Sequence, residues 1–323
     1  MTLSSQPSAP LVVVVGATGF QGGSVVRELI ASDKPYRLRG LTRDDTKPAA
    51  QAMMELGVEV VAVTISVGNE AAVLRAFHGA DIVFSVTNFW EHLDVSRELA
   101  EGKLMVDAAK AVGAKLFVFS GALSVTENSG GKYTHIIQWD SKAEIAAYAQ
   151  SQLPTVNCQA GYYTINLANP YVGPRRLEDG SYVWEQPDLN DQLYPYIDTG
   201  YDYGLWVRYA IESPEYNKGG GTILTWGELL RPSEVAAILE RTRGIKIKVT
   251  TWADRETQRK YLESLGAPPH VVLDVIEHAF MSEFGYYFGQ ERSEEQQKIR
   301  AALARKPRTL EEFLKANPEF FKQ

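Results

Sequence analysis

The stretch LVVVVGATGFQG, residues 11–22, decides the fold of this chain. Its first part, Leu11 to Val15, is a continuous apolar run between a proline and a glycine, which is typical of a strand buried on both faces of a parallel sheet. The rest has glycines in a GxxGxxG arrangement, where missing side chains permit a tight turn and let backbone N–H groups approach a pyrophosphate. The following helix N-terminus adds aligned donors and partial positive charge. The stretch predicts a dinucleotide-binding turn with contacts from Gly16, Ala17, Thr18, Gly19, Phe20, Gln21 and Gly22.

The neighbouring residues favour this interpretation over a purely structural glycine turn. Apolar residues recur at helical spacing over 21–32, and a strand pattern follows over 37–42. The alternation then continues, with helix patterns over 48–56, 69–77, 93–112 and 141–150 and strand patterns over 59–65, 81–86, 115–120 and 155–160. Strands that alternate with helices predict an α/β fold with a Rossmann-type doubly wound parallel sheet.

The composition changes beyond residue 160. Residues 162–203 are rich in Tyr, Pro, Gly and Asn, and we expect irregular surface over a cleft. Later patterns predict a strand over 222–225 that completes the sheet, a helix over 232–244, a strand over 245–250 and helical segments over 253–285 and 309–315. We therefore predict a nucleotide-binding Rossmann domain over residues 1–160 and a smaller, mostly helical α/β lobe over 161–323.

The residue after the second predicted strand selects between the two nicotinamide cofactors. An acidic side chain there accepts a hydrogen bond from the ribose 2′-hydroxyl, whereas an arginine accommodates a 2′-phosphate. Here Arg43 follows Thr42, and Lys47 supplies a second charge nearby. These residues predict NADP(H) binding. The alternative is that Arg43 and Lys47 are ordinary solvated side chains at the start of a helix, with their charges offset by Asp44 and Asp45.

Composition and charge narrow the class of protein. The net charge of −7 disfavours direct nucleic-acid binding, which needs clustered Lys and Arg. The single cysteine, Cys158, excludes an internal disulfide and is typical of a reducing compartment, so we expect a cytoplasmic or nuclear protein. We expect neither a secretory signal nor a membrane span, and the five histidines lack metal-ligand spacing, so no metal is expected.

The motifs together resemble the NmrA-like family of atypical short-chain dehydrogenase/reductases, including its HSCARG branch. The resemblance rests on residues 16–25, 41–43, 86–91, 102–103 and 119–121 and on Lys142, and it extends loosely through 197–199 and Gly204. The resemblance implies that the protein senses NADP(H) rather than catalyses a reaction with it. It also implies that Thr87, Asn88 and Phe89 line the ribose and nicotinamide side of the cofactor, next to Tyr163 and Asn166.

Each of these implied contacts has a plainer alternative. Thr87 and Asn88 also suit a polar loop before the core aromatic Phe89, and Tyr163 and Asn166 suit a generic turn. Thr64 stands where the HSCARG branch carries an acidic residue, so the adenine-side contacts are expected to differ.

The usual catalytic pair of this superfamily is broken. Typical members place a Tyr four residues before a Lys, which lowers the phenol pKa so that the Tyr can protonate a nascent alkoxide. Lys142 is present, but Gln138 precedes it and cannot act as an acid. Lys142 can still bind the ribose or act on a substrate, and the alternative is that it is an exposed helix lysine. Ser120 and His135 are weaker catalytic candidates. For Ser120 the alternative is a plain hydroxyl at the end of a strand, and for His135 it is a solvated histidine on a loop.

Two functions fit these residues. The first is an NADP(H) sensor that passes its state to a protein partner such as a transcription factor, and we favour it because the cofactor motif is intact while the Tyr is missing. The second is an NADPH-dependent reductase of an aromatic or quinone-like molecule, because aromatic residues are dense over 162–206. Either protein can form homo-oligomers.

Overall fold

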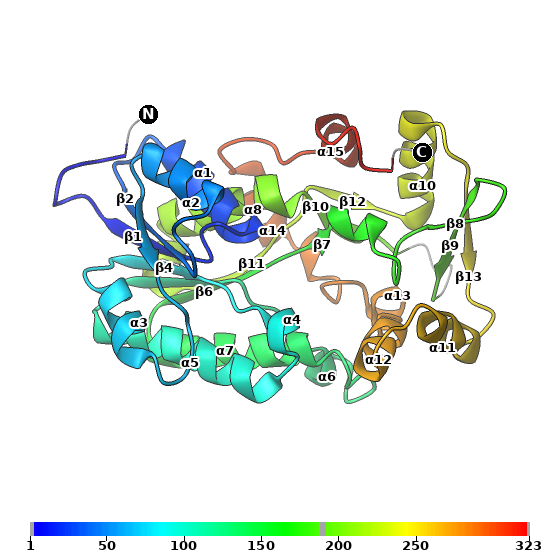
Figure 1. The fold of residues 1–323 in the computed structure, drawn as a ribbon, viewed down its shortest axis with the longest axis horizontal. Helices are drawn as coiled ribbons and strands as arrows, with labels where there is room; N and C mark the ends of the chain where they lie inside the picture. Colours follow the sequence, from blue (N-terminus) through cyan, green and yellow to red (C-terminus); the bar gives the residue numbers. More distant parts are fainter. Residues whose placement is uncertain (1–2, 188–191, 322–323) are drawn as a thin grey trace.

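The computed structural model describes residues 3–187 and 192–321 and has a seven-stranded parallel sheet at its centre (Figure 1). The strand order is β11-β6-β5-β4-β1-β2-β3, and each neighbouring pair is parallel. This confirms the predicted Rossmann-type sheet. The strands are β1 (Leu11–Val15), β2 (Arg37–Thr42), β3 (Glu59–Ala62), β4 (Ile82–Ser85), β5 (Leu116–Phe119), β6 (Thr155–Gln159) and β11 (Gly221–Leu224).

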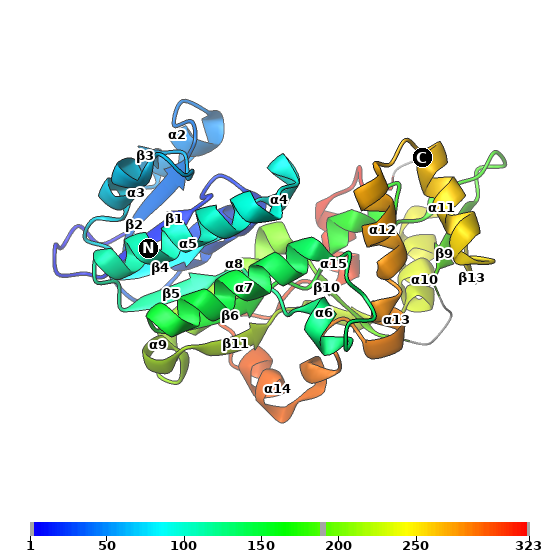
Figure 2. The ribbon, with the colours of Figure 1, turned by 90° about the horizontal axis from the view of Figure 1, so that it is seen from below.

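Helices cover both faces of this sheet (Figures 1 and 2). One face packs against α1 (Phe20–Ile30) and α8 (Thr199–Glu212), and the other against α3 (Glu70–Phe77), α5 (Val95–Ala111) and α7 (Ile137–Gln152). β1 is buried along its whole length, as its unbroken apolar run predicts, because it lies between these two layers. The remaining helices of this half are α2 (Pro48–Glu55), α4 (Phe89–His92) and α6 (Val125–Asn128).

Helices α1 and α8 approach each other closely at Gly204. The Gly204 N–H donates to Ser24 Oγ at 2.9 Å, and a Cβ on Gly204 would lie 2.2 Å from the Ser24 carbonyl oxygen. Only a residue without a side chain fits there. The contact fixes α8 beside the helix that begins at the glycine turn.

The second half of the chain contains more strand than its composition predicts. Residues 162–203, expected to be irregular, hold β7 (Tyr162–Tyr163), β8 (Arg175–Arg176), β9 (Tyr182–Gln186) and β10 (Tyr194–Ile197). With β12 (Glu228–Leu230) and β13 (Ile247–Thr251) they form two three-stranded sheets, ordered β12-β10-β7 and β13-β9-β8. The expectation was wrong because burial of the aromatic side chains outweighs the local turn preference of Pro and Gly.

The helical segments are also divided differently from the prediction. The expected helix over 93–112 is confirmed as α5, and the short helix α4, which was not predicted, precedes it; Leu93, with φ 54°, separates the two. The expected segment over 253–285 is three helices, since Gly266, with φ 75°, and the following prolines stop the first of them. The helices of this half are α9 (Tyr216–Gly219), α10 (Pro232–Arg243), α11 (Arg255–Ser264), α12 (Pro269–Glu277), α13 (Phe280–Phe284), α14 (Glu294–Ala301) and α15 (Leu310–Ala316), with short 3-10 turns at Thr164–Ala168 and Gln290–Arg292.

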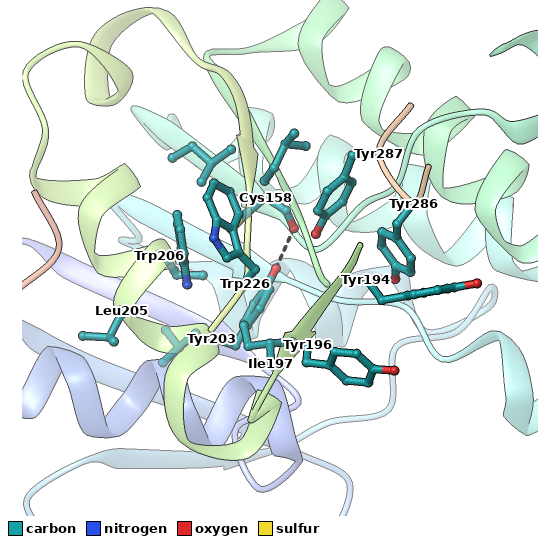
Figure 3. Packing of buried hydrophobic residues seen from close by; sticks show 14 of the residues in the cluster. Cys158, Tyr194, Tyr196, Ile197, Tyr203, Leu205, Trp206, Trp226, Tyr286 and Tyr287 are labelled. Carbon is teal, nitrogen blue, oxygen red and sulfur yellow. Dashed lines mark hydrogen bonds between the residues drawn. The ribbon is translucent and has the colours of Figure 1, made fainter. Parts of the chain in front are cut away.

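Most of the dense aromatic residues belong to the core. Figure 3 shows Tyr203 and Trp206 of α8 packed with Trp226, and the Tyr203 hydroxyl donates to the Cys158 carbonyl at 2.7 Å. The other buried members are Tyr182, Trp184, Tyr194 and Tyr196, whereas Tyr201 stacks under Arg308. Only part of the aromatic set therefore remains for a binding site.

None of the helices in the described parts of the chain combines the length and the apolar character that crossing a bilayer requires.

Candidate functional site

A cavity of about 1050 Å³ lies at the carboxyl ends of the sheet strands and continues between the sheet and α12 and α13. Crevices at this edge are where open α/β sheets hold ligands. The glycine turn borders one part of the cavity, and residues of α7 and α12 border another. Its volume is large enough for a dinucleotide together with a small substrate.

The glycine turn has the geometry of a pyrophosphate cradle. Gly16 has φ 65°, a Cβ on Gly22 would lie 2.2 Å from the Gly16 carbonyl oxygen, and the Gly19 N–H donates to that same oxygen at 2.9 Å. Gly19 is the N-cap of α1 and its helix has no side-chain cap. The N-terminus of α1 is therefore open to an anion, and the turn fits the group that its sequence predicts.

Gln21 adds a free acceptor beside the turn. Its Nε2 donates to the Tyr163 hydroxyl at 2.8 Å, and its Oε1 is buried with no hydrogen-bond partner within the described residues. A buried acceptor without a partner is costly unless a ligand donor meets it. A ribose hydroxyl has the right chemistry, and Asn166 also lines the cavity.

Arg43 lies at the end of β2 on the cavity wall, paired with Glu91 of α4. Glu91 also accepts from Asn88 Nδ2 at 3.1 Å, so one carboxylate joins the two segments that follow β2 and β4. Thr42 and Thr18 meet through their hydroxyls at 3.3 Å. Lys47, predicted as a second phosphate contact, is exposed and does not border the cavity.

Lys142 lies on α7 in an ion pair with Glu98 of α5, whose side chain is only 2% exposed. Glu98 accepts in addition from Thr87 Oγ1 at 2.7 Å and from Ser141 Oγ. Burial lowers the pKa of Lys142 below its usual value, and the Glu98 charge partly offsets that effect. The Lys142 side chain, 18% exposed, is therefore held in one orientation on the cavity wall, and the alternative of an exposed helix lysine is wrong.

Sequence reasoning missed Glu98 as a site residue. Its place on a helix between ordinary charged residues resembles a solvated face, and only the packing of α5 on α7 buries it.

A second polar chain crosses from α7 to α12. Gln138 Nε2 donates to Asp274 Oδ1 at 2.7 Å, both side chains are buried, and Asp274 Oδ2 lies 3.5 Å from His278 Nε2. Gln138, Asp274 and His278 all border the cavity. Sequence analysis missed Asp274 and His278 because no pattern in the sequence indicates that α12 packs against Gln138.

The two weaker catalytic candidates have different positions. Ser120 is buried on the cavity wall, where its N–H donates to the Ser85 carbonyl at 2.9 Å. His135 does not border the cavity, and its Nδ1 lies 2.6 Å from Glu277 Oε1 of α12. The structure thus separates His135 from the other predicted site residues.

The end of the cavity remote from the phosphate cradle is aromatic and apolar. Trp139, Tyr162, Tyr171 and Met281 contribute to its wall. Tyr286 and Tyr287 also border it, but their hydroxyls donate to backbone carbonyls, at 3.2 Å to Ala160 and 2.9 Å to Thr225. Burial raises the pKa of both phenols well above the usual value. Neither phenol is placed to protonate a substrate.

Comparison with known proteins agrees with this geometry. A model of the NmrA-like family matches residues 8–314. The NmrA-like family domain-containing oxidoreductase cpsB of Aspergillus campestris is 33% identical over 236 residues, 68% of each chain. The corresponding oxidoreductase malD of Malbranchea aurantiaca is 27% identical over 305 residues, 88% of this chain and 87% of its own length.

Solved structures share the fold at lower identity. A structure described as NmrA, a negative transcriptional regulator, in complex with NADP has a TM-score of 0.72 at 20% identity and covers 94% of each chain. An NADPH-dependent quinone oxidoreductase of Escherichia coli, complexed with NADPH, has a TM-score of 0.71 at 18% identity and covers 95% of this chain and 99% of its own.

Proposed function

Because the chain belongs to the NmrA-like family, we propose that it is an NADPH-dependent oxidoreductase that reduces an aromatic or quinone-like small molecule. The observation that carries the proposal is one cavity that joins the glycine turn, the buried Lys142 and an aromatic end. Named relatives such as cpsB and malD are called oxidoreductases, which supports an enzyme over the sensor that the missing Tyr led us to expect.

The proposed cofactor contacts follow from the site. The open N-terminus of α1 and the glycine turn would hold the pyrophosphate, Arg43 the 2′-phosphate, and Gln21 and Lys142 the ribose hydroxyls of the nicotinamide half. Thr87 and Ser141 keep Glu98 in place under Lys142, so the ammonium is held at one position. When bound, NADPH supplies the hydride.

The substrate would lie against the aromatic wall. Trp139, Tyr162 and Tyr171 present ring surfaces there, which favours a flat, weakly polar molecule over a charged one. Ser120 and Lys142 supply the polar contacts that orient a carbonyl.

The test is NADPH oxidation with a panel of quinones, enones and imines, followed at 340 nm on the order of minutes. We expect turnover with at least one aromatic substrate and its loss in Lys142→Met. Lys110→Met is the matched control, since Lys110 lies on the exposed side of α5 and bonds to Gln152. Absence of turnover across the panel, with NADPH binding retained, would contradict the proposal.

That same outcome would support the second candidate, an NADP(H)-responsive regulator. The contact that favours it is the Arg43–Glu91 pair, because a 2′-phosphate that competes for Arg43 would release Glu91 and α4. Five further points remain predictions: membership of the HSCARG branch, a transcription-factor partner, a homo-oligomer, a cytoplasmic or nuclear location, and the division of the chain at residue 160.

A further inference from the structure

Four polar side chains of α7 and α12 border the same cavity. On α7, Gln138 stands one turn before Lys142, and on α12, Asp274 stands one turn before His278. The buried Gln138–Asp274 hydrogen bond, 2.7 Å long, joins the two helices. His278 is therefore placed opposite the position that holds the acidic Tyr in typical members of the superfamily.

Reduction of a carbonyl or an enone needs a proton as well as a hydride. Gln138 has no acidic proton, and the phenols of Tyr286 and Tyr287 donate to backbone carbonyls. The phenols of Tyr162, Tyr163 and Tyr171 border the cavity as well, and burial raises the pKa of Tyr162 and Tyr163 above the usual value. Of the neutral or cationic nitrogen groups on the wall, His92 lies on α4 beside Glu91, whereas Lys142 lies on α7 and His278 at the end of α12. Lys142 is held by Glu98 on the α5 side.

We propose that His278 donates the proton in the reduction, and that Asp274, held by Gln138, is the positioning residue that orients its ring. This inference rests on the proposed function, because it assigns a residue to that reaction. Asp274 Oδ2 faces His278 Nε2 at 3.5 Å, which leaves Nδ1 as the nitrogen that serves the substrate. The distance is that of a charge contact which can tighten when substrate is bound.

The groups around His278 are negative or neutral. It is the C-cap residue of α12, where the helix dipole is negative, and its backbone N–H donates to the Asp274 carbonyl at 3.1 Å. Asp274 presents a carboxylate to the ring, while Gln138, the facing residue of α7, is neutral. A protonated imidazole next to an apolar substrate is a suitable acid.

Bound NADPH would supply a hydride with its electron pair to a carbon of the substrate. The π electrons of a carbonyl would move to its oxygen, and those of the C=C bond of an enone would form an enolate shared by the α-carbon and the oxygen. That oxygen or carbon takes a proton from His278. The products are the reduced substrate, NADP⁺ and a neutral imidazole, which takes up a proton from water through the open side of the cavity.

The experiment compares the full-length wild type with His278→Gln, Asp274→Asn and the control His270→Gln. His270 is exposed in the first turn of the same helix and does not border the cavity. We expect kcat to fall by about 100-fold or more in His278→Gln and by about tenfold in Asp274→Asn, with an unchanged NADPH Kd. His270→Gln should keep the wild-type kcat.

A second measurement reports on position without turnover. In nitrogen NMR of protein labelled at histidine, the signals missing from the spectrum of His278→Gln belong to the His278 ring. In Asp274→Asn the Nε2 resonance of His278 should shift, because the charge that faces this nitrogen is lost. An unshifted resonance would overturn the positioning role. An active wild type with an equally active His278→Gln would overturn the donor role alone, whereas an inactive wild type would overturn the proposed function together with it.

Discussion

Lys142 and Glu98 form an ion pair in which the side chains are 18% and 2% exposed, so two opposite charges are buried together between α7 and α5. A buried ammonium without a carboxylate would lose its proton, and a buried carboxylate without donors would gain one. Glu98 gives the Lys142 ammonium an opposite charge and itself accepts from Thr87 and Ser141, so both buried groups have polar partners. The Glu98 charge raises the pKa of Lys142 and so opposes the lowering by burial.

Replacing Glu98 should change the pH range over which the cofactor binds. Burial lowers the pKa of Lys142 and Glu98 raises it, so Glu98→Gln leaves the lowering unopposed. As the pH rises, Lys142 should lose its proton earlier in Glu98→Gln than in wild type, and NADPH affinity should therefore begin to fall at a lower pH in the variant. Fluorescence titration across a pH series measures this. Glu144→Gln is the control, since Glu144 pairs with Lys103 on the exposed side of α7. Superimposed profiles for Glu98→Gln and wild type would contradict the role of the pair.

Arg43→Ala should discriminate between the two cofactors. A hydrogen bond to a charged group contributes about 1.5–3 kcal/mol, so loss of the 2′-phosphate contact should weaken NADPH binding roughly 10- to 100-fold. NADH lacks the phosphate, and its affinity should change little. Calorimetric titration with both cofactors measures this, and equal losses would refute the assignment of Arg43.

Glu91→Gln should have the opposite effect at the same place. The Glu91 carboxylate is bonded to Arg43 and repels a phosphate, so its neutral analogue should tighten NADPH binding a few-fold and leave NADH binding unchanged. The same titrations report it. Weaker NADPH binding would mean that Glu91 helps to bind the cofactor.

Gly204→Ala should destabilise the protein, because the new Cβ would lie 2.2 Å from the Ser24 carbonyl oxygen and push α8 from α1. Overpacking of this kind costs about 1–3 kcal/mol, measured by urea unfolding. Gly219→Ala is the matched control, since no atom lies within 4 Å of a Cβ there. It should be neutral or slightly stabilising. Equal midpoints for Gly204→Ala and wild type would show that the helices can separate at little cost.

Cys158 should be unreactive in the folded protein. Its side chain is buried in β6, and burial raises the pKa of the thiol to about 12, so little thiolate forms at neutral pH. A thiol reagent should leave the native protein unmodified over hours and modify one cysteine after denaturation. Rapid modification of the native protein would show that this strand opens.

The sheet was predictable because its signals are local. An apolar run such as Leu11 to Val15 needs burial on both faces, and glycines at 16, 19 and 22 suit one kind of turn. The prediction failed at Tyr194 to Ile197, where Pro195 indicates a break although β10 lies between β7 and β12. There, cross-strand contacts and aromatic burial decide the conformation, and neither can be read from neighbouring residues.

The sequence by itself determined the Rossmann-type sheet and the glycine turn that follows its first strand, and it placed Arg43 after β2 and Lys142 on α7, because each of these features depends on residues close together in the chain. Only the tertiary structure decided that Lys142 is paired with Glu98, that Glu91 holds Arg43, and that Asp274 meets Gln138 across 136 positions. Those contacts depend on how helices pack, and packing brings together charges that no local pattern relates.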